Sequence, residues 1–352
     1  MSNFTQLLLQ WFSETPRHLP WKNHQDLYSI WLSEIIMQQT RVAYGTAYYQ
    51  KFKAMFPTVF DLANADLDEV IKAWEGLGYY SRARNLHATA KVVAKELDGK
   101  FPEDYVELQT LKGIGAYTAA AMLSFGLNKP IVAIDGNAYR VLARYFGITT
   151  PIHSSKAKRE FFARGQELIE QVPDKAGDFN QAIMNFGAMV CTPKSPNCET
   201  CVLSNTCFAY QQGLVQTLPV KKKKQPLKKR YFVFIILEQH GHFFVRQRRE
   251  KDVWQNLYEF VQIETENEQP WADVISQSTV SKQLSQFTVK RVFDEEQTLT
   301  HQRIFAQIVW LKPITAIEPW GDYVLTQGEE LSALPFPKLL QNAVNLINLD
   351  FT

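Results

Sequence analysis

The chain has 352 residues, of which 45% are hydrophobic, and its 38 basic and 36 acidic side chains give a formal net charge of +2 at pH 7. This length is enough for two or three domains with a large buried core, and the near-neutral balance excludes bulk charge as the source of any attraction for nucleic acid. No run of 18 or more apolar residues occurs, and the N-terminus lacks the order of a signal peptide, so we expect an intracellular protein without a membrane anchor.

The first 52 residues contain two helical patterns. Residues 4 to 13 have the spacing of an amphipathic helix, and the loop that follows exposes Arg17, a candidate for contact with a ligand. Residues 26 to 52 predict one long helix, with Asp26 as its N-terminal cap.

Glu34 lies among the apolar residues of this second pattern. Apolar surroundings disfavour an ionised carboxyl group and raise its pKa, so Glu34 is a candidate acid near neutral pH. The plain alternative is a half-exposed glutamate paired across one helical turn. Gln38 is expected one turn further along the same face, with Gln39 beside it.

Residues 58 to 98 predict two more helices, joined through the sequence GLGYYSRARNL. Gly76 and Gly78 interrupt the helical pattern, and Tyr79 follows them beside arginines. Aromatic faces next to guanidinium groups suit stacking on bases and holding phosphates, although the same composition is common at the edge of a helix.

The stretch from 111 to 140 reads LKGIGAYTAAAMLSFGLNKPIVAIDGNAYR. Gly113 and Gly115 allow a tight turn, and the helix that starts after them presents free backbone N–H groups that suit a phosphate oxygen. Asp135 stands between a short apolar run and a second helical pattern, so we place its carboxylate at that helix N-terminus, which favours ionisation. A simple turn and a simple helix cap are the alternatives.

Helices predicted at 155 to 171 and 177 to 190 lead into a loop that contains every cysteine of the chain. Six, two and five residues separate these cysteines, and such close spacing in an intracellular chain favours one metal site over two disulfides. Zinc and iron–sulfur sites both use four thiolates. The candidate ligands are Cys191, Cys198, Cys201 and Cys207.

A change of composition marks the C-terminal part. Residues 221 to 230 hold seven basic and no acidic side chains, and prolines at 219 and 226 flank the lysine run, which predicts a linker at 218–230. From residue 231 short β-rich segments alternate with helical stretches near 271 to 284 and 336 to 348, as in an α+β domain. We therefore divide the chain into domains at 1–217 and 231–352.

The hairpin glycines, the Gly/Pro-containing loop and Asp135 resemble the helix-hairpin-helix motif at 111–140 of the endonuclease III superfamily of DNA glycosylases. The cysteine spacing at 191–207 resembles the iron–sulfur loop of that superfamily, which implies a [4Fe–4S] cluster that ties the loop together and holds Lys194 near DNA. The strings WLSEIIMQQT and GLGYYSRARNLH resemble adenine DNA glycosylases of the MutY type, and the C-terminal segments resemble their Nudix-like domain.

This resemblance implies a multidomain fold, with an all-α helix-hairpin-helix glycosylase domain that carries the iron–sulfur loop and an α+β Nudix-like C-terminal domain. It makes Glu34 and Asp135 catalytic, and places Tyr117 and Asn137 at the same site. It implies DNA contacts for a larger set, in which the first tyrosine of the pair wedges into the base stack: Arg17, Gln38, Gln39, Tyr79, Gly113, Gly115, Lys194, Thr300 and His301.

The sequence departs from the family pattern in several places. Tyr117 stands where members that also cut the DNA backbone have a lysine, which implies a glycosylase without strand cleavage. Leu299 stands where the family has the phenylalanine of a Phe-Ser-His loop, and Gln255 and Asn256 stand where it commonly has glycines. The glutamate-rich REx2EE element that holds Mg²⁺ in Nudix hydrolases does not occur, so the C-terminal domain is expected to bind rather than hydrolyse.

The function that follows is removal of adenine paired with 8-oxoguanine or guanine in double-stranded DNA, leaving an abasic site. We expect a monomer in the cytoplasm, at the bacterial nucleoid, with replication or mismatch-repair proteins as possible partners. Three alternatives stay open: a thymine or uracil mismatch glycosylase, a non-catalytic protein that binds lesions, and a Nudix hydrolase of the nucleotide pool.

Overall fold

The computed structural model describes residues 4–17, 26–152, 154–221, 226–284 and 286–351. The chain forms two compact units: unit 1 comprises residues 1–64 and 85–223, and unit 2 comprises residues 65–84 and 224–352. None of the helices in the described ranges is both long and apolar enough to cross a membrane.

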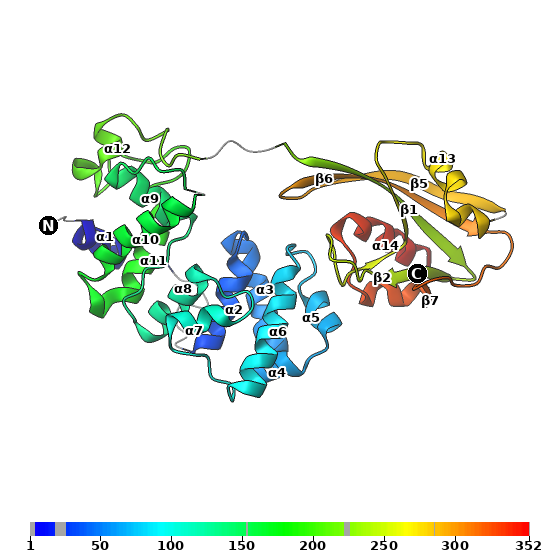
Figure 1. Ribbon diagram of the computed structural model, residues 1–352, viewed down its shortest axis with the longest axis horizontal. Coiled ribbons are helices and arrows are strands. Elements are labelled where there is room, and N and C mark those ends of the chain that lie inside the picture. Colours follow the sequence, from blue (N-terminus) through cyan, green and yellow to red (C-terminus); the bar gives the residue numbers. More distant parts are fainter. Residues whose placement is uncertain (1–3, 18–25, 153, 222–225, 285, 352) are drawn as a thin grey trace. The chain divides into compact units, whose positions relative to one another are not determined.

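Helices build unit 1, as the blue to green part of Figure 1 shows. In chain order they are α1 (Phe4–Glu14), α2 (Leu27–Met37), α3 (Val42–Met55), α4 (Val59–Asn64), α6 (Ser81–Glu96, which starts in unit 2), α7 (Tyr105–Thr110), α8 (Ala116–Leu127), α9 (Gly136–Phe146), α10 (Ser155–Ile169), α11 (Ala176–Met189) and α12 (Phe208–Gln211). The predicted cap of α2 is confirmed, since the Ser29 N–H donates to Asp26 Oδ1 at 2.8 Å.

Two packing arrangements position the functional residues of unit 1. Helix α11 packs against α1, α8 and α9, and α2 packs against α8. Fully buried aromatic rings such as Phe161, Phe179 and Phe186 fill the core shared by α1, α9, α10 and α11. Because these interiors are close-packed, the N-termini of α8 and α9 are held in fixed positions.

The single helix predicted over residues 26 to 52 is wrong. Helix α2 ends at Met37, and Gln39 has a φ of 56°, a left-handed conformation that no helix continues through. Helix α3 then folds back against the end of α2. The approach is so close that a Cβ on Gly45 would stand 2.6 Å from the sulfur of Met37. The uninterrupted pattern predicts that Gln38 lies on the same helical face as Glu34, with Gln39 beside it. In the structure both glutamines follow the end of α2, so neither lies on that face.

Residues 58 to 98 hold three helices rather than the two predicted, because residues 65–66 separate α4 from α5 (Leu67–Ala73). The short helix α7 was also missed. Its sequence signal is Asp104, whose carboxylate accepts from the N–H groups of Val106 and Glu107 at 2.8 and 3.0 Å.

Unit 2 is built on a mixed sheet, drawn in yellow-green to orange in Figure 1. Strand β1 (Lys228–Gln239) is central: it pairs in parallel with β6 (Gln302–Pro313) and antiparallel with β4 (Val261–Thr265). Beyond these lie β2 (His242–Gln247), β3 (Tyr258–Glu259), β5 (Phe287–Thr298) and β7 (Val324–Gln327), with helices α13 (Trp271–Gln277) and α14 (Lys338–Phe351). Strand β1 begins inside the predicted linker, of which residues 222–225 lie outside the described part.

Residues 65–84 belong to unit 2 and are fastened to its C-terminal residues by polar contacts. Gln247 Nε2 donates to Asp68 Oδ1 at 2.7 Å, and Lys72 Nζ donates to the Leu334 carbonyl at 3.0 Å. Glu75 Oε1 accepts from the Phe336 N–H at 3.2 Å. The chain therefore enters unit 2 early, leaves it within α6, and returns after residue 223.

A two-residue turn, His240–Gly241, joins β1 to β2, since Gln239 pairs with His242. Both turn residues have positive φ, 51° and 77°, which is the type I′ geometry that favours Asn-Gly. His240→Asn should therefore raise the free energy of unfolding of unit 2 by roughly 0.5 to 1 kcal/mol. Urea unfolding would measure it, with His242→Asn as control; an equal gain in the control would contradict the conformational explanation.

Candidate active site

Three side chains from three elements of unit 1 meet at the candidate site. Glu34 comes from α2, Tyr117 from the first turn of α8, and Asp135 from the residue before α9. The Tyr117 hydroxyl donates to Met184 Sδ at 3.8 Å, and both Tyr117 and Asp135 lie close enough to the Glu34 carboxyl group to influence its pKa. The structure therefore brings together the two acids that the sequence placed 101 residues apart.

Burial dominates the electrostatics of this site. It raises the pKa of Glu34 from its ordinary 4.5 to about 7, an effect that outweighs the lowering by the nearby Tyr117 hydroxyl. The same burial, together with the two neighbouring carboxyl groups, raises the pKa of the Tyr117 hydroxyl well above its ordinary value. The raised pKa of Glu34 has the direction that the sequence predicts, and its role as an acid stays a prediction.

For Asp135 the expected direction is wrong. Its carboxylate accepts from the Ala138 N–H at 2.7 Å and from Asn137 Nδ2 at 2.8 Å, and both contacts lower its pKa. Burial contributes more, so the net pKa of Asp135 is raised above its ordinary 3.8. The sequence predicts the helix N-terminus, and its N–H groups do lower the pKa of Asp135. It does not predict that the Asp135 carboxyl group is desolvated.

Asn137 is fixed by a second residue that the sequence reasoning missed. Its Oδ1 accepts from Arg140 Nη2 at 2.8 Å, and Arg140 Nε donates to the Cys191 carbonyl at 2.7 Å. Arg140 Nη2 also donates to the Gly187 carbonyl at 2.5 Å. The signal in the sequence was an arginine three residues after Asn137, on the same face of a predicted helix.

The loop before Asp135 is held by amides from two helices. Asn180 Oδ1 accepts from the Ala133 N–H at 3.0 Å, and its Nδ2 donates to the Ile131 carbonyl at 2.9 Å. Gln166 Oε1 accepts from the Val132 N–H at 3.1 Å. These contacts give Asn180 a structural role, and they set the position at which α9 begins.

The hairpin glycines differ in what they do. Gly113 has a φ of 80°, and a Cβ there would also stand 2.9 Å from Asn85 Cβ, so this position requires glycine. Gly115 has extended backbone and caps α8, as predicted, and a Cβ there would meet no atom within 4 Å. The open space leaves the first N–H groups of α8 accessible from outside.

The remaining predicted contacts of unit 1 lie in three separate places. Gln38 Nε2 donates to Thr118 Oγ1 at 3.3 Å, which ties the end of α2 to α8, whereas Gln39 is exposed. Arg17 Nη1 donates to Asn185 Oδ1 at 3.3 Å. Lys194 is exposed in the cysteine loop.

In unit 2, Tyr79 and the loop between β5 and β6 meet directly. The Tyr79 hydroxyl and Thr300 Oγ1 are 2.7 Å apart, and both line one pocket together with His301 and Trp254. Tyr79 is 46% exposed and has a φ of 49°, so an aromatic ring is held out from the backbone in a left-handed conformation. Exposed aromatic rings in strained positions are typical of binding sites.

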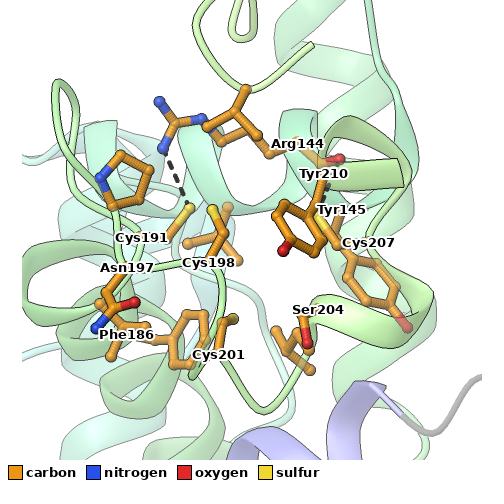
Figure 2. Close-up of a pocket in the computed structure, with 15 residues that line it drawn as sticks. Arg144, Tyr145, Phe186, Cys191, Asn197, Cys198, Cys201, Ser204, Cys207 and Tyr210 are labelled. Carbon is orange, nitrogen blue, oxygen red and sulfur yellow. Dashed lines mark hydrogen bonds between the residues drawn. The ribbon is translucent and has the colours of Figure 1, made fainter. Parts of the chain in front are cut away.

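The four cysteines stand around one space, as Figure 2 shows. None of the four forms a disulfide and all are partly buried, and apolar side chains such as Val141 and Phe186 line the rest of the pocket. Among the described Cys, His, Asp and Glu side chains, no three converge closely enough to hold a single metal ion. Four thiols around an apolar space fit a group larger than one ion.

Arg144 secures this loop from α9. Its guanidinium group is 3% exposed and donates to the Thr192 and Pro193 carbonyls at 2.7 and 3.1 Å, and to Cys191 Sγ at 3.4 Å. Burial raises the pKa of the Cys201 thiol to about 11. Binding of iron would release this proton, since the thiolate is the ligand.

Three family models match the chain. Residues 32–167 match the HhH-GPD superfamily of base excision DNA repair proteins, residues 191–207 match the iron–sulfur binding domain of endonuclease III, and residues 232–346 match the NUDIX domain. The predicted fold class is thereby confirmed, and the cofactor of the 191–207 loop is a [4Fe–4S] cluster.

Several relatives of known function are similar over most of the chain. The adenine DNA glycosylase of Buchnera aphidicola from Schizaphis graminum is 37% identical over 263 residues, which are 74% of this chain and 75% of that protein. The one from Buchnera aphidicola of Baizongia pistaciae is 33% identical over 311 residues, 88% of this chain and 86% of its own length. The rat adenine DNA glycosylase is 40% identical over 228 residues, 61% of this chain and 44% of the relative.

Solved structures share the fold of the helical part. A thermostable thymine-DNA glycosylase matches with a TM-score of 0.55 and 28% identity, covering 59% of this chain and 95% of that one. A trapped covalent intermediate of endonuclease III with DNA matches with a TM-score of 0.51 at 19% identity, covering 60% and 95%, which shows the fold alone.

The raised pKa of Glu34 predicts how stability depends on pH. Between about pH 4.5 and 7 the folded state keeps the proton that the unfolded chain releases, so stability falls as pH rises through this window. Glu34→Gln removes the buried charge. It should be more stable than the parent at pH 8, by a difference on the order of 1 to 3 kcal/mol that vanishes at pH 4.5.

Urea unfolding across this pH range would measure the effect. Glu107→Gln, at an exposed glutamate of α7, controls for loss of a glutamate charge in unit 1. A Glu34→Gln difference that stays constant with pH would contradict the raised pKa.

Proposed function

This chain belongs to the adenine DNA glycosylases and acts on DNA, and we propose that it removes adenine paired with 8-oxoguanine or guanine by hydrolysis, leaving an abasic site. The observation that carries this proposal is the pair of partly buried carboxyl groups, Glu34 and Asp135, which lie close enough to influence each other's charge, with Tyr117 beside the first. Two acids in one desolvated site are what cleavage of a glycosidic bond needs.

In this mechanism the adenine leaves the base stack before its glycosidic bond is reached. Glu34, which its pKa of about 7 leaves partly protonated at neutral pH, donates its proton to N7 of the adenine and makes the base a better leaving group. Tyr117 lies beside the Glu34 carboxyl group and lowers its pKa, against the larger effect of burial. No lysine is present at position 117 to attack the sugar, so the reaction ends in hydrolysis without strand cleavage.

Loss of the base leaves an oxocarbenium-like sugar, which an anion stabilises. Asp135 supplies that anion, and it either stabilises the charge or captures the sugar for a short time as a retaining glycosidase does. Both carboxylate oxygens of Asp135 already accept hydrogen bonds, from Ala138 and Asn137, so the charge is directed without further reorganisation. Asn137, held by Arg140, is placed to polarise the sugar or the water.

DNA contacts are assigned to groups that the fold leaves accessible. The first N–H groups of α8, after Gly115, are accessible and suit a phosphate next to the turn at Gly113, while Arg17, Lys194, Gln38 and Gln39 are assigned to the backbone and the bases. When bound, the [4Fe–4S] cluster would be held by Cys191, Cys198, Cys201 and Cys207 and would tie this loop together. In unit 2, exposed Tyr79 wedges into the stack, and Thr300 and His301 contact the oxidised base.

The deciding experiment is single-turnover release of adenine from duplexes with adenine opposite 8-oxoguanine or guanine, with alkali treatment to reveal abasic sites. We expect release from both and faster release opposite 8-oxoguanine. A duplex with thymine opposite guanine tests the thymine mismatch alternative. Thymine release without adenine release would overturn the proposal.

Glu34→Gln and Asp135→Asn separate the two acids. Each should slow base release by about 10² to 10⁴-fold while duplex binding persists. Asparagine also caps helices well, so Asp135→Asn removes the charge and keeps the cap of α9. The parent rate should fall above about pH 7, as Glu34 loses its proton. Loss of folding in Asp135→Asn would point to a structural role instead.

A further inference from the structure

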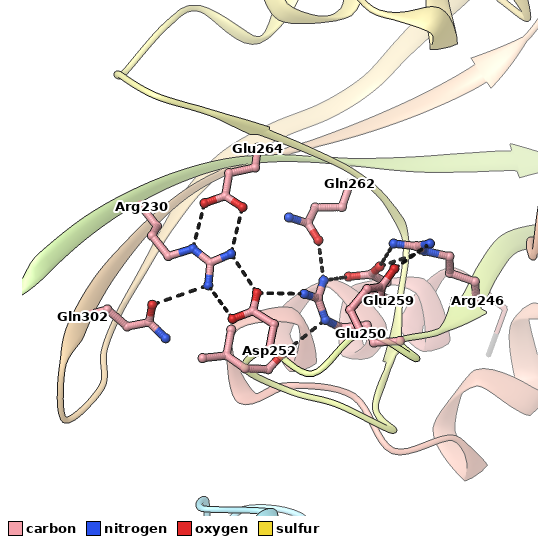
Figure 3. Close-up of polar contacts among 10 residues, drawn as sticks. Arg230, Arg246, Glu250, Asp252, Glu259, Gln262, Glu264 and Gln302 are labelled. Carbon is pink, nitrogen blue, oxygen red and sulfur yellow. Dashed lines mark hydrogen bonds and ion pairs between the residues drawn. The ribbon is translucent and has the colours of Figure 1, made fainter.

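The guanidinium group of Arg230 holds two loops of unit 2 at once (Figure 3). Nε and Nη2 donate to the two oxygens of Glu264 at 2.7 Å each, and Nη1 and Nη2 donate to those of Asp252 at 2.9 and 2.8 Å. Nη1 also donates to Gln302 Oε1 at 3.4 Å. Every N–H of this group therefore has an acceptor, and the side chain is only 8% exposed.

Two of these partners begin or end loops. Asp252 starts the loop over 252–256, and Gln302 closes the turn that carries Thr300 and His301 between β5 and β6. The strand of Arg230 also reaches this turn through its backbone, because the Lys228 N–H donates to the His301 carbonyl at 3.1 Å. Arg230 is thus the group that both loops share.

The two loops form walls of one pocket. Asp252 and Trp254 line it from the first loop, Thr300 and Gln302 line it from the second, and Tyr79 lines it as well. The hydrogen bond between the hydroxyl groups of Tyr79 and Thr300 closes one side of this pocket. The distance between the loops therefore sets the shape of the pocket in which Thr300 lies.

The first loop needs such support because its backbone is strained. Trp254 and Asn256 have φ values of 62° and 67°, left-handed conformations that side chains other than glycine adopt at a cost. Around them, Arg248 Nε donates to the Val253 carbonyl at 3.2 Å, and the Trp254 ring packs edge-on against Phe232 at 6.1 Å. The Arg230 guanidinium covers that same Phe232 ring at 4.8 Å.

We propose that Arg230 is a positioning residue for lesion recognition, which sets Thr300 and the 252–256 loop at the spacing that distinguishes 8-oxoguanine from guanine. This inference rests on the proposed function. Without the guanidinium group, the Asp252 carboxylate loses its bidentate ion pair and keeps the longer one with Arg248 at 3.3 Å, so the strained loop relaxes and the two walls separate. Lysine would reach one carboxylate but could not bind both in bidentate fashion.

The test compares three variants of the full chain. Arg230→Met removes the charge and the fork, and Arg230→Lys keeps the charge. Arg303→Met is the matched control: Arg303 lies on the neighbouring strand β6, is bidentate with Glu296 at the surface, and covers a phenylalanine ring. It therefore removes a similar ion pair whose partner, Glu296, belongs to neither loop.

Two readouts are measured. The ratio of single-turnover adenine release opposite 8-oxoguanine to that opposite guanine should fall about fivefold in Arg230→Met, less in Arg230→Lys, and not in Arg303→Met. The rate opposite guanine should stay within about twofold of the parent. Hydrogen exchange followed by mass spectrometry should rise in peptides over 252–256 and 298–302 in Arg230→Met alone, with peptides of unit 1 as the internal reference.

An unchanged ratio in folded Arg230→Met, or an equal fall of both rates, would overturn the inference. Unchanged exchange in both loops would overturn it too, whatever the substrate. If the parent itself releases adenine equally fast from both duplexes, lesion preference fails as part of the proposed function. That outcome removes the recognition role of Arg230, while hydrogen exchange still decides whether it positions the loops.

Discussion

The carboxyl group of Asp135 is both the cap of helix α9 and one of the two acids of the site. Its Oδ1 accepts from the Ala138 N–H and its Oδ2 from Asn137 Nδ2, so neither oxygen can turn without breaking a contact. Burial raises the pKa of this group while the hydrogen bonds lower it. The contacts that fix where the helix starts therefore also fix the position of the carboxylate. An anion held in this way is preorganised.

Helix α9 carries more than this acid. Arg140 and Arg144 extend from it to the backbone of the cysteine loop, the first at Cys191 and the second at Thr192 and Pro193. Arg144 Nε also donates to the Leu218 carbonyl at 3.0 Å, at the end of unit 1. Buried guanidinium groups satisfied by carbonyls fix backbone without needing a counter-charge. Hydrogen bonds from Cys191 through Arg140 to Asn137 and Asp135 connect the cysteine loop to the site. A displacement of the loop backbone is therefore transmitted to Asn137 and Asp135.

Local chemistry explains what the sequence predicted well. Asp26 and Asp135 cap helices, Gly113 takes the positive φ of the hairpin, and the β-rich segments after residue 231 become the long strands β1, β5 and β6. Each of these depends on residues near in sequence. The clustering of four cysteines likewise made their shared pocket predictable.

What the sequence could not give depends on contacts between distant residues. The break at Gln39 has no glycine or proline to mark it, and the fold-back of α3 depends on Gly45 meeting Met37. The net pKa of Asp135 depends on how deeply α9 is buried. The role of Arg140 depends on Cys191, 51 residues away. Residues 65–84 carried no signal that they group with the C-terminal residues.

The unit that contains residues 65–84 and 224–352 also constrains the order in which the protein can be completed. Asp68, Lys72 and Glu75 leave the ribosome long before their partners at 247, 334 and 336 have been made. At synthesis rates of about 5 to 20 residues per second, this interval exceeds roughly ten seconds. During that time these polar groups face water or transient neighbours, so the last stage of folding waits for the C-terminal residues and closes contacts of high sequence separation.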